Sequence, residues 1–186
     1  KHERASDCFE KAEILDPQDA EIANNLGVAL FNGGRLDAAR KSLERGIKLN
    51  GNYAEARNNL GNVLVKLNLL QEARAQYEAS LAINPNYPEA LNNYGLLLAK
   101  VSETGSAVDS FANALRLKPD YAEAQRNFSD LLARVSFLEA RPDLEQTILV
   151  LLNSLSSCRP IAMSRSIMSL VKQSNTFQTL VSLLDQ

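Results

Sequence analysis

The sequence is poor in the residue types that enzymes and metalloproteins commonly use for chemistry. It has no tryptophan, a single histidine (His2) and two cysteines (Cys8 and Cys158) among 186 residues. Two cysteines cannot form a disulfide framework, and one histidine supplies a zinc site poorly. The sequence also has no phosphate-binding glycine loop and no Ser-His-Asp set. We therefore expect a chain that is not an enzyme by itself and that needs no cofactor and no metal.

An excess of one charge and long apolar runs are also missing. The chain has 20 basic and 22 acidic side chains and a formal net charge of −2, so it lacks the basic character that attracts nucleic acid or an anionic membrane. No apolar run approaches the ~18–20 residues that span a bilayer. We expect no nucleic acid partner, no membrane insertion and a cytoplasmic location. Hydrophobic residues make up 45% of the chain, which is typical of a folded protein.

The sequence does contain an internal repeat with a period of 34 residues. Residues 24–27 and 58–61 both have the sequence Asn-Asn-Leu-Gly, residues 92–95 have Asn-Asn-Tyr-Gly, and a degraded copy begins at Arg126. Further columns keep the same step: Leu30, Leu64, Leu98 and Leu132; Ala39, Ala73 and Ala107; Leu43, Tyr77 and Phe111. Several columns in register over three periods indicate a repeat architecture.

The apolar spacing within each period predicts two helices. In the unit that begins at Ala54, apolar or small residues recur at i, i+4 and i+7 in the first half. Gly34 and Asn68 fall between the two halves, where a left-handed residue can end a helix. We expect Gly27, Gly61 and Gly95 to lie where the two helices of a unit approach closely, because a side chain there would push them apart.

Residue pairs with capping spacing precede each predicted first helix. They are Asn52 with Glu55, Asn86 with Glu89 and Asp120 with Glu123. An N-cap side chain followed three residues later by glutamate is typical of a helix start. Tyrosines stand at the same phase, and we expect them to pack at turns rather than to bind ligand; they are Tyr53, Tyr87 and Tyr121.

The pattern Leu-Gly-x-x-Leu, then Ala-x-x-x-Phe, then Pro, with its 34-residue period, resembles the tetratricopeptide repeat family. The resemblance implies an all-α fold, a right-handed α-solenoid of helix-turn-helix repeats. It divides residues 1–135 into a half repeat, three full repeats and the first helix of a fourth; these are residues 1–19, 20–53, 54–87, 88–121 and 122–135. The large aromatic residue that often precedes the Leu-Gly pair is missing, since its places hold Ala23, Arg57, Leu91 and Gln125.

Residues 136–186 have a different composition, because they are rich in serine, poor in charge and without glycine. Their apolar spacing predicts three short helices. We expect these helices to form a C-terminal helical cap on the last repeat. The alternative is a connector to another domain.

The resemblance places one face of the first helices along a concave groove. It puts Asn25, Asn59, Asn93 and Asn127 in a row there, similar to the asparagines that hold substrate peptides in the repeats of O-linked N-acetylglucosamine transferase. An amide side chain both donates and accepts, so it can bind the backbone of an extended peptide whatever its sequence. The predicted groove residues are Asn25, Asn58, Asn59, Asn62, Lys66, Asn92, Asn93, Lys100, Arg126 and Asn127. The alternative is that these asparagines are solvated, locally hydrogen-bonded residues.

The predicted function is a protein-protein interaction scaffold that binds a peptide or partner segment in this groove. The alternative is the substrate-recognition segment of a larger enzyme, of glycosyltransferase or methyltransferase type, whose catalytic domain is not in this chain. A clamp for acidic C-terminal tails is disfavoured, because Asn58, Glu89 and Asn93 occupy the places where that clamp needs basic residues.

The N-terminal half repeat has a second helix without a first. Its open side, near Ile14 and Leu15, predicts either a further helix upstream or a homo-oligomer that forms through residues 3–15.

Overall fold

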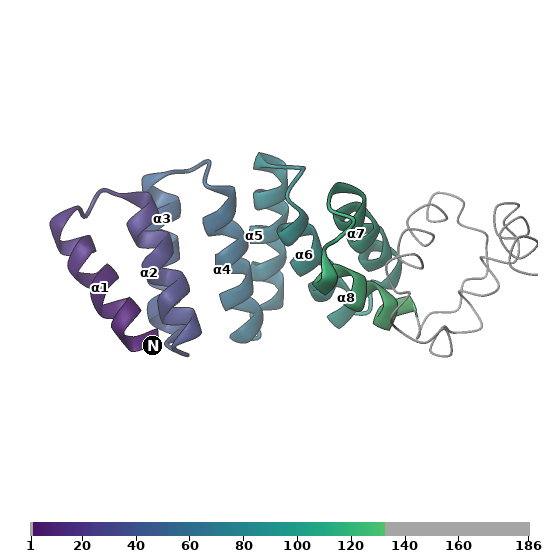
Figure 1. Cartoon of the computed structure of the whole chain (residues 1–186), viewed down its shortest axis with the longest axis horizontal. Helices are drawn as coiled ribbons and strands as arrows, with labels where there is room; N and C mark the ends of the chain where they lie inside the picture. Colours follow the sequence, from purple (N-terminus) through teal and green to yellow (C-terminus); the bar gives the residue numbers. More distant parts are fainter. Residues whose placement is uncertain (1, 133–186) are drawn as a thin grey trace, which may run out of the picture. The chain divides into compact units, whose positions relative to one another are not determined.

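A computed structural model describes residues 2–132, and within that range all regular structure is helical (Figure 1). The helices are α1 (His2–Leu15), α2 (Ala20–Asn32), α3 (Leu36–Leu49), α4 (Ala54–Lys66), α5 (Leu70–Ile83), α6 (Pro88–Lys100), α7 (Thr104–Leu117) and α8 (Ala122–Leu132). The predicted all-α fold of paired helices is confirmed for this part of the chain. The predictions for residues 133–186, including the C-terminal cap, lie outside the described residues.

The helices follow the period of the sequence. The second helices begin at His2, Leu36, Leu70 and Thr104, and the first helices begin at Ala20, Ala54, Pro88 and Ala122. Each start therefore lies 34 residues after its equivalent. Because the same sequence columns recur, the helices recur at the same step. Their caps differ, since the Asp19 side chain accepts from the backbone N–H groups of Glu21 and Ile22 at the start of α2, whereas α4 has no side-chain cap.

The chain divides by its internal contacts into two compact units, Lys1–Leu97 and Leu98–Gln186. In the first unit, α2 packs against α3 and α4 against α5 as helical hairpins (Figure 1). Successive hairpins stack because α1 packs against α2 and α3 against α4. In the second unit α7 packs against α8, where the rings of Phe111 and Phe128 lie 6.4 Å apart between centroids.

Gly27 and Gly61 lie at the closest approach within the hairpins α2–α3 and α4–α5, as predicted. A Cβ added to Gly61 would lie 2.5 Å from Cε1 of Tyr77, and one added to Gly27 would lie 2.5 Å from Cγ of Leu43. Real Cβ atoms do not come this close to another side chain, so both positions require glycine for packing. The column of Leu30 and Leu64 is buried beside them.

The turns within the hairpins use a left-handed residue at one column. Gly34 has φ 75°, Asn68 has φ 60° and Ser102 has φ 65°. The left-handed geometry predicted for Gly34 and Asn68 is confirmed. Ser102 adopts it without the freedom of glycine, which places a small strain in the turn between α6 and α7.

The prediction that Asn52 caps α4 is wrong. The boundary residue is Tyr53, which makes no side-chain capping hydrogen bond. The polar residue that shapes this turn is Asn50, whose Oδ1 accepts the backbone N–H of Asn52 at 3.1 Å. The same turn recurs 34 residues to either side, where Asp16 accepts from Gln18 and Asn84 accepts from Asn86. Short amide and carboxylate side chains form such local turns readily, and they compete with capping.

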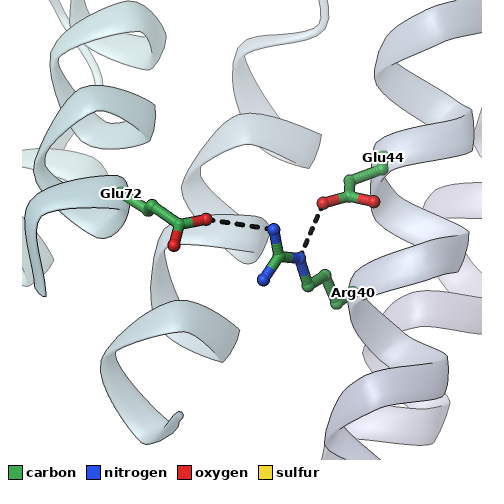
Figure 2. Close-up of polar contacts among 3 residues, drawn as sticks. All are labelled: Arg40, Glu44 and Glu72. Carbon is green, nitrogen blue, oxygen red and sulfur yellow. Dashed lines mark hydrogen bonds and ion pairs between the residues drawn. The ribbon is translucent and has the colours of Figure 1, made fainter. Parts of the chain in front are cut away.

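Ion pairs join neighbouring second helices in the first unit. The guanidinium of Arg40 on α3 binds Glu44 at 2.7 Å and reaches Glu72 on α5 at 3.0 Å (Figure 2). The hydrogen bond to Glu44 raises the pKa of Arg40 above its usual value. Arg45 of α3 pairs with Glu13 of α1 at 2.6 Å. These side chains are partly exposed, so each pair contributes only about 0–1 kcal/mol.

Candidate functional site

The first helices of the unit Lys1–Leu97 form its inner face. Helix α2 approaches α4 directly, whereas α3 and α5 make no equally extensive contact and meet through Arg40 and Glu72. In this unit the first helices lie closer together than the second helices. The stack of hairpins therefore curves toward the side of the first helices. We call this surface, on α2, α4 and α6 as far as Leu97, the first-helix face.

Three predicted asparagines lie partly exposed on this face. They are Asn25 on α2, Asn59 on α4 and Asn93 on α6. Apolar side chains lie near them along the same helices, with Val28 and Val65 half-buried and Leu96 42% exposed. Lys66 is exposed at the end of α4. The face therefore offers amides and small apolar surfaces, which suits a polypeptide more than a charged ligand.

Asn58 and Asn92 are not on the open surface that the helical spacing predicts for them. Asn58 is 3% exposed and Asn92 is fully buried. Asn24, the equivalent residue of the first full repeat, is 1% exposed. The next repeat covers this edge of α2 and α4, and spacing along one helix does not reveal how far a neighbour extends over it. Asn58 and Asn92 therefore do not present their side chains to a ligand.

The buried asparagines bind the exposed ones of the next repeat. Nδ2 of Asn59 donates to Oδ1 of Asn24 at 2.9 Å, and Nδ2 of Asn93 donates to Oδ1 of Asn58 at 3.0 Å. Asn24 in turn donates from Nδ2 to Glu55 at 3.3 Å. The two residues of the pairs 24–25 and 58–59 thus have different roles, since the first is an interior acceptor and the second lies at the surface.

Tyrosines complete these polar clusters. Burial raises the pKa of Tyr87 to about 12, with the carboxylates of Glu55 and Glu89 adding to the effect and a hydrogen bond from Asn58 opposing it. Burial also raises the pKa of Tyr53, where Glu55 and Glu21 act in the same direction and Asn24 opposes them. Both phenols remain neutral at physiological pH, so the clusters hold neutral hydrogen-bonding groups beside the glutamates.

Asn62 has a packing partner of its own. The hydroxyl of Tyr77 donates to its Oδ1 at 2.7 Å, and Tyr77 is 1% exposed. Because a buried hydroxyl without a partner is costly, Asn62 serves the hairpin core at least as much as the surface.

The remaining predicted residues belong to the second unit. Lys100 and Arg126 are exposed there, and Asn127 is partly exposed. At the other end of the described chain, Ile14 and Leu15 are 80% and 87% exposed. The homo-oligomer through residues 3–15 stays a prediction.

Sequence reasoning missed the role of Asn24 and Asn58 as buried hydrogen-bond acceptors of the surface asparagines. A signal was present, because the first asparagine of each pair recurs at the same 34-residue step as the second. A strictly repeated polar residue beside a buried stripe is consistent with an interface between repeats as well as with a ligand site.

Other kinds of site find no support in the described part of the chain. No group of three or more potential metal ligands occurs there, and Cys8 is a free, exposed thiol. None of the helices described between residues 2 and 132 is both long and apolar enough to cross a bilayer.

Comparison with known structures gives similar folds at low sequence identity. The crystal structure of MamA is 21% identical, with 83% of this chain and 86% of that chain covered and a TM-score of 0.66. The Arabidopsis OM64 tetratricopeptide repeat (TPR) domain is 22% identical, with coverage of 62% and 96% and a TM-score of 0.60. The first TPR of Spaghetti (RPAP3), bound to the HSP90 peptide SRMEEVD, is 20% identical, with coverage of 62% and 92% and a TM-score of 0.59.

Comparison of sequences identifies the family. A search of curated proteins gives no significant match. A sequence profile described as the tetratricopeptide repeat matches residues 1–54, 34–88 and 58–122. Each match is longer than one and a half of the 34-residue periods, and together they cover residues 1–122 of 186. The helix starts, the packed glycines and the left-handed turns described above recur within the same range. The chain therefore belongs to the tetratricopeptide repeat family.

Proposed function

We propose that this chain is a protein-protein interaction scaffold whose first-helix face binds an extended segment of a partner protein. The observation that carries the proposal is the set of partly exposed carboxamides of Asn25, Asn59 and Asn93, one on each successive first helix. A backbone amide recurs along any extended segment, so regularly repeated side-chain amides suit its binding. A solved relative of the same fold with a bound peptide supports the proposal.

The chemistry of the face favours a segment with apolar side chains over an acidic tail. Val28, Val65 and Leu96 provide apolar surface on the same helices as the amides, while Glu21 and Glu55 are exposed at the beginning of α2 and α4. Lys66 is the only exposed basic residue on α2 and α4, which the structure describes in full. An acidic tail would meet repulsion from the two glutamates and little compensating positive charge.

The test begins with an array of random synthetic 12-residue peptides, from which a binder is chosen and measured by titration calorimetry. We expect the double variant Asn59→Ala, Asn93→Ala to bind that peptide more weakly by about 1–3 kcal/mol, because two neutral hydrogen bonds are lost. The matched control is Asn52→Ala, Asn86→Ala, with the same substitutions and the same spacing at exposed positions in the turns between repeats.

Stability has to be separated from affinity in this test. Asn59 and Asn93 also donate to buried oxygen atoms, so their loss destabilises the fold. Titrations are therefore done at a temperature where circular dichroism shows every variant fully folded. Equal affinity of the double variant and the control would refute binding through the asparagines, and an array without binders would refute peptide binding itself.

A further inference from the structure

The orientation of the surface amide of Asn59 is determined by a chain of hydrogen bonds that ends on a carboxylate. A carboxylate accepts hydrogen bonds and does not donate them. Asn24 therefore turns its NH2 group toward Glu55, 3.3 Å away, and its oxygen toward Asn59. That oxygen accepts from Nδ2 of Asn59 at 2.9 Å, so the NH2 group of Asn59 points into the interface between repeats.

The next repeat has the same bond between an outer and an inner asparagine, 34 residues on. Oδ1 of Asn58 accepts from Nδ2 of Asn93 at 3.0 Å. Both inner asparagines are almost completely shielded from solvent, at 1% exposure for Asn24 and 3% for Asn58. Water cannot easily replace these bonds, because a buried acceptor left without a donor is costly.

The outer oxygen atoms of the two surface amides have no donor. No group in residues 2–132 donates to Oδ1 of Asn59 or of Asn93. In a planar carboxamide the oxygen lies on the other side of the group from the nitrogen. With one N–H of Nδ2 held inward, Oδ1 faces away from the interface between repeats, where it can accept a hydrogen bond from a ligand.

We propose that Asn24 and Asn58 are positioning residues that make Asn59 and Asn93 hydrogen-bond acceptors toward the bound segment. This inference rests on the proposed function and adds a selectivity to it. The surface recognises two backbone N–H groups and disfavours proline or any other tertiary amide at those two places, because these have no N–H to donate. An amide free to rotate could equally well donate to a carbonyl or accept from an N–H.

Asn25 provides an internal comparison. It stands at the same column as Asn59 and Asn93, and it makes no hydrogen bond to any residue in the described part of the chain. Its amide is free to turn either way, so it confers no preference for N–H over carbonyl.

The first experiment needs no ligand. Hydrogen exchange of side-chain amides is measured by nuclear magnetic resonance on protein labelled with ¹⁵N-asparagine. We expect slow exchange at Asn59 and Asn93 and fast exchange at Asn25. Asn24→Ala speeds the exchange of Asn59 alone, and Asn58→Ala that of Asn93 alone. Exchange at Asn59 and Asn93 as fast as at Asn25 would overturn the fixed orientation.

The second experiment uses the array-selected peptide and replaces each of its amide bonds in turn by an ester, which removes one N–H. We expect two positions at which the ester weakens binding, each about 2- to 10-fold. One of the two effects vanishes in Asn59→Ala and shrinks in Asn24→Ala, whereas a purely structural role of Asn24 would weaken all the peptides equally.

The matched control for this second experiment is Ser80→Ala. This change removes another buried hydrogen bond, from Ser80 to the carbonyl of Ala54 at 2.7 Å, and should leave both ester effects intact. If the peptide binds through Asn59 and Asn93 but no ester position is linked to them, the inference fails and the proposed function stands. If no peptide binds, the proposed function and the recognition of N–H groups fail together.

Discussion

The hairpins α2–α3 and α4–α5 have the same backbone arrangement, but different side chains pack against the glycine in their cores. In the first hairpin Leu43 lies against Gly27, and in the second Tyr77 lies against Gly61. Tyr77 introduces a buried hydroxyl, and Asn62 accepts its hydrogen bond at 2.7 Å. The position equivalent to Asn62 in the first hairpin is Val28.

The difference shows that two columns of the repeat are coupled. An apolar residue at the Leu43 column is accompanied by an apolar residue at the Val28 column, and a tyrosine is accompanied by an amide. Burial raises the pKa of Tyr77 far above its usual value, so the phenol stays protonated and always needs an acceptor. Glycine is compatible with either side chain, because its role is only to leave space for the residue that packs against it.

The largest losses of stability should come from truncating the buried leucine that the two hairpins share. Leu30 and Leu64 are buried at the same column. We expect Leu30→Ala and Leu64→Ala each to lower the free energy of unfolding by about 2–5 kcal/mol, because each leaves a cavity. Denaturant titration followed by circular dichroism measures both values. A midpoint unchanged from the parent would mean that this column is not part of the core.

Replacing the glycine by alanine should destabilise the two hairpins to different extents, because the side chain packed against the glycine is stiffer in one hairpin than in the other. Gly61→Ala would bring a methyl group against three atoms of the Tyr77 ring within 2.8 Å, and we expect a loss of about 1–3 kcal/mol. Gly27→Ala meets the branched, more easily rotated end of Leu43, so we expect a smaller loss. Thermal melting of the two variants compares them directly, and a greater loss in Gly27→Ala would refute this dependence on the neighbour's stiffness.

The coupling of the two columns is tested by a double-mutant cycle in the second hairpin. Asn62→Val leaves the hydroxyl of Tyr77 without its acceptor and should cost about 1–3 kcal/mol. Adding Tyr77→Phe removes the hydroxyl as well, and we expect the double variant to be more stable than Asn62→Val alone. Unfolding free energies of the four proteins give the coupling, and strictly additive losses would show that no such coupling exists.

The smallest effect extends the comparison to the turns. Gly34 and Asn68 occupy the left-handed position in the first two hairpins, and Ser102 occupies it in the turn between α6 and α7. Ser102→Gly should raise stability by up to about 1 kcal/mol, because glycine adopts this backbone without strain. Asn68→Gly is the matched control and should change stability less, since asparagine tolerates the left-handed region. A lower melting temperature for Ser102→Gly would contradict the strain at this turn.

Much of the fold could be predicted from the sequence because its signals are local. Helix starts and ends repeat with the sequence period, and a residue such as Asn68 indicates its own backbone conformation. The close approach at Gly61 was also predictable, since a glycine that recurs on the apolar side of a helix leaves room for a neighbouring helix. Asn52 was misassigned as a cap because Asn50, two residues earlier, has the same local chemistry and forms the turn.

The sequence by itself determined the helical period, the pairing of helices within each repeat and the row of surface asparagines. Only the tertiary structure decided which asparagine of each pair lies inside. Spacing along one helix defines a face, but the neighbouring repeat determines where that face becomes buried. The orientation of the amide of Asn59 depends on Asn24 and, through it, on Glu55, and these contacts arise only when α2 and α4 pack together.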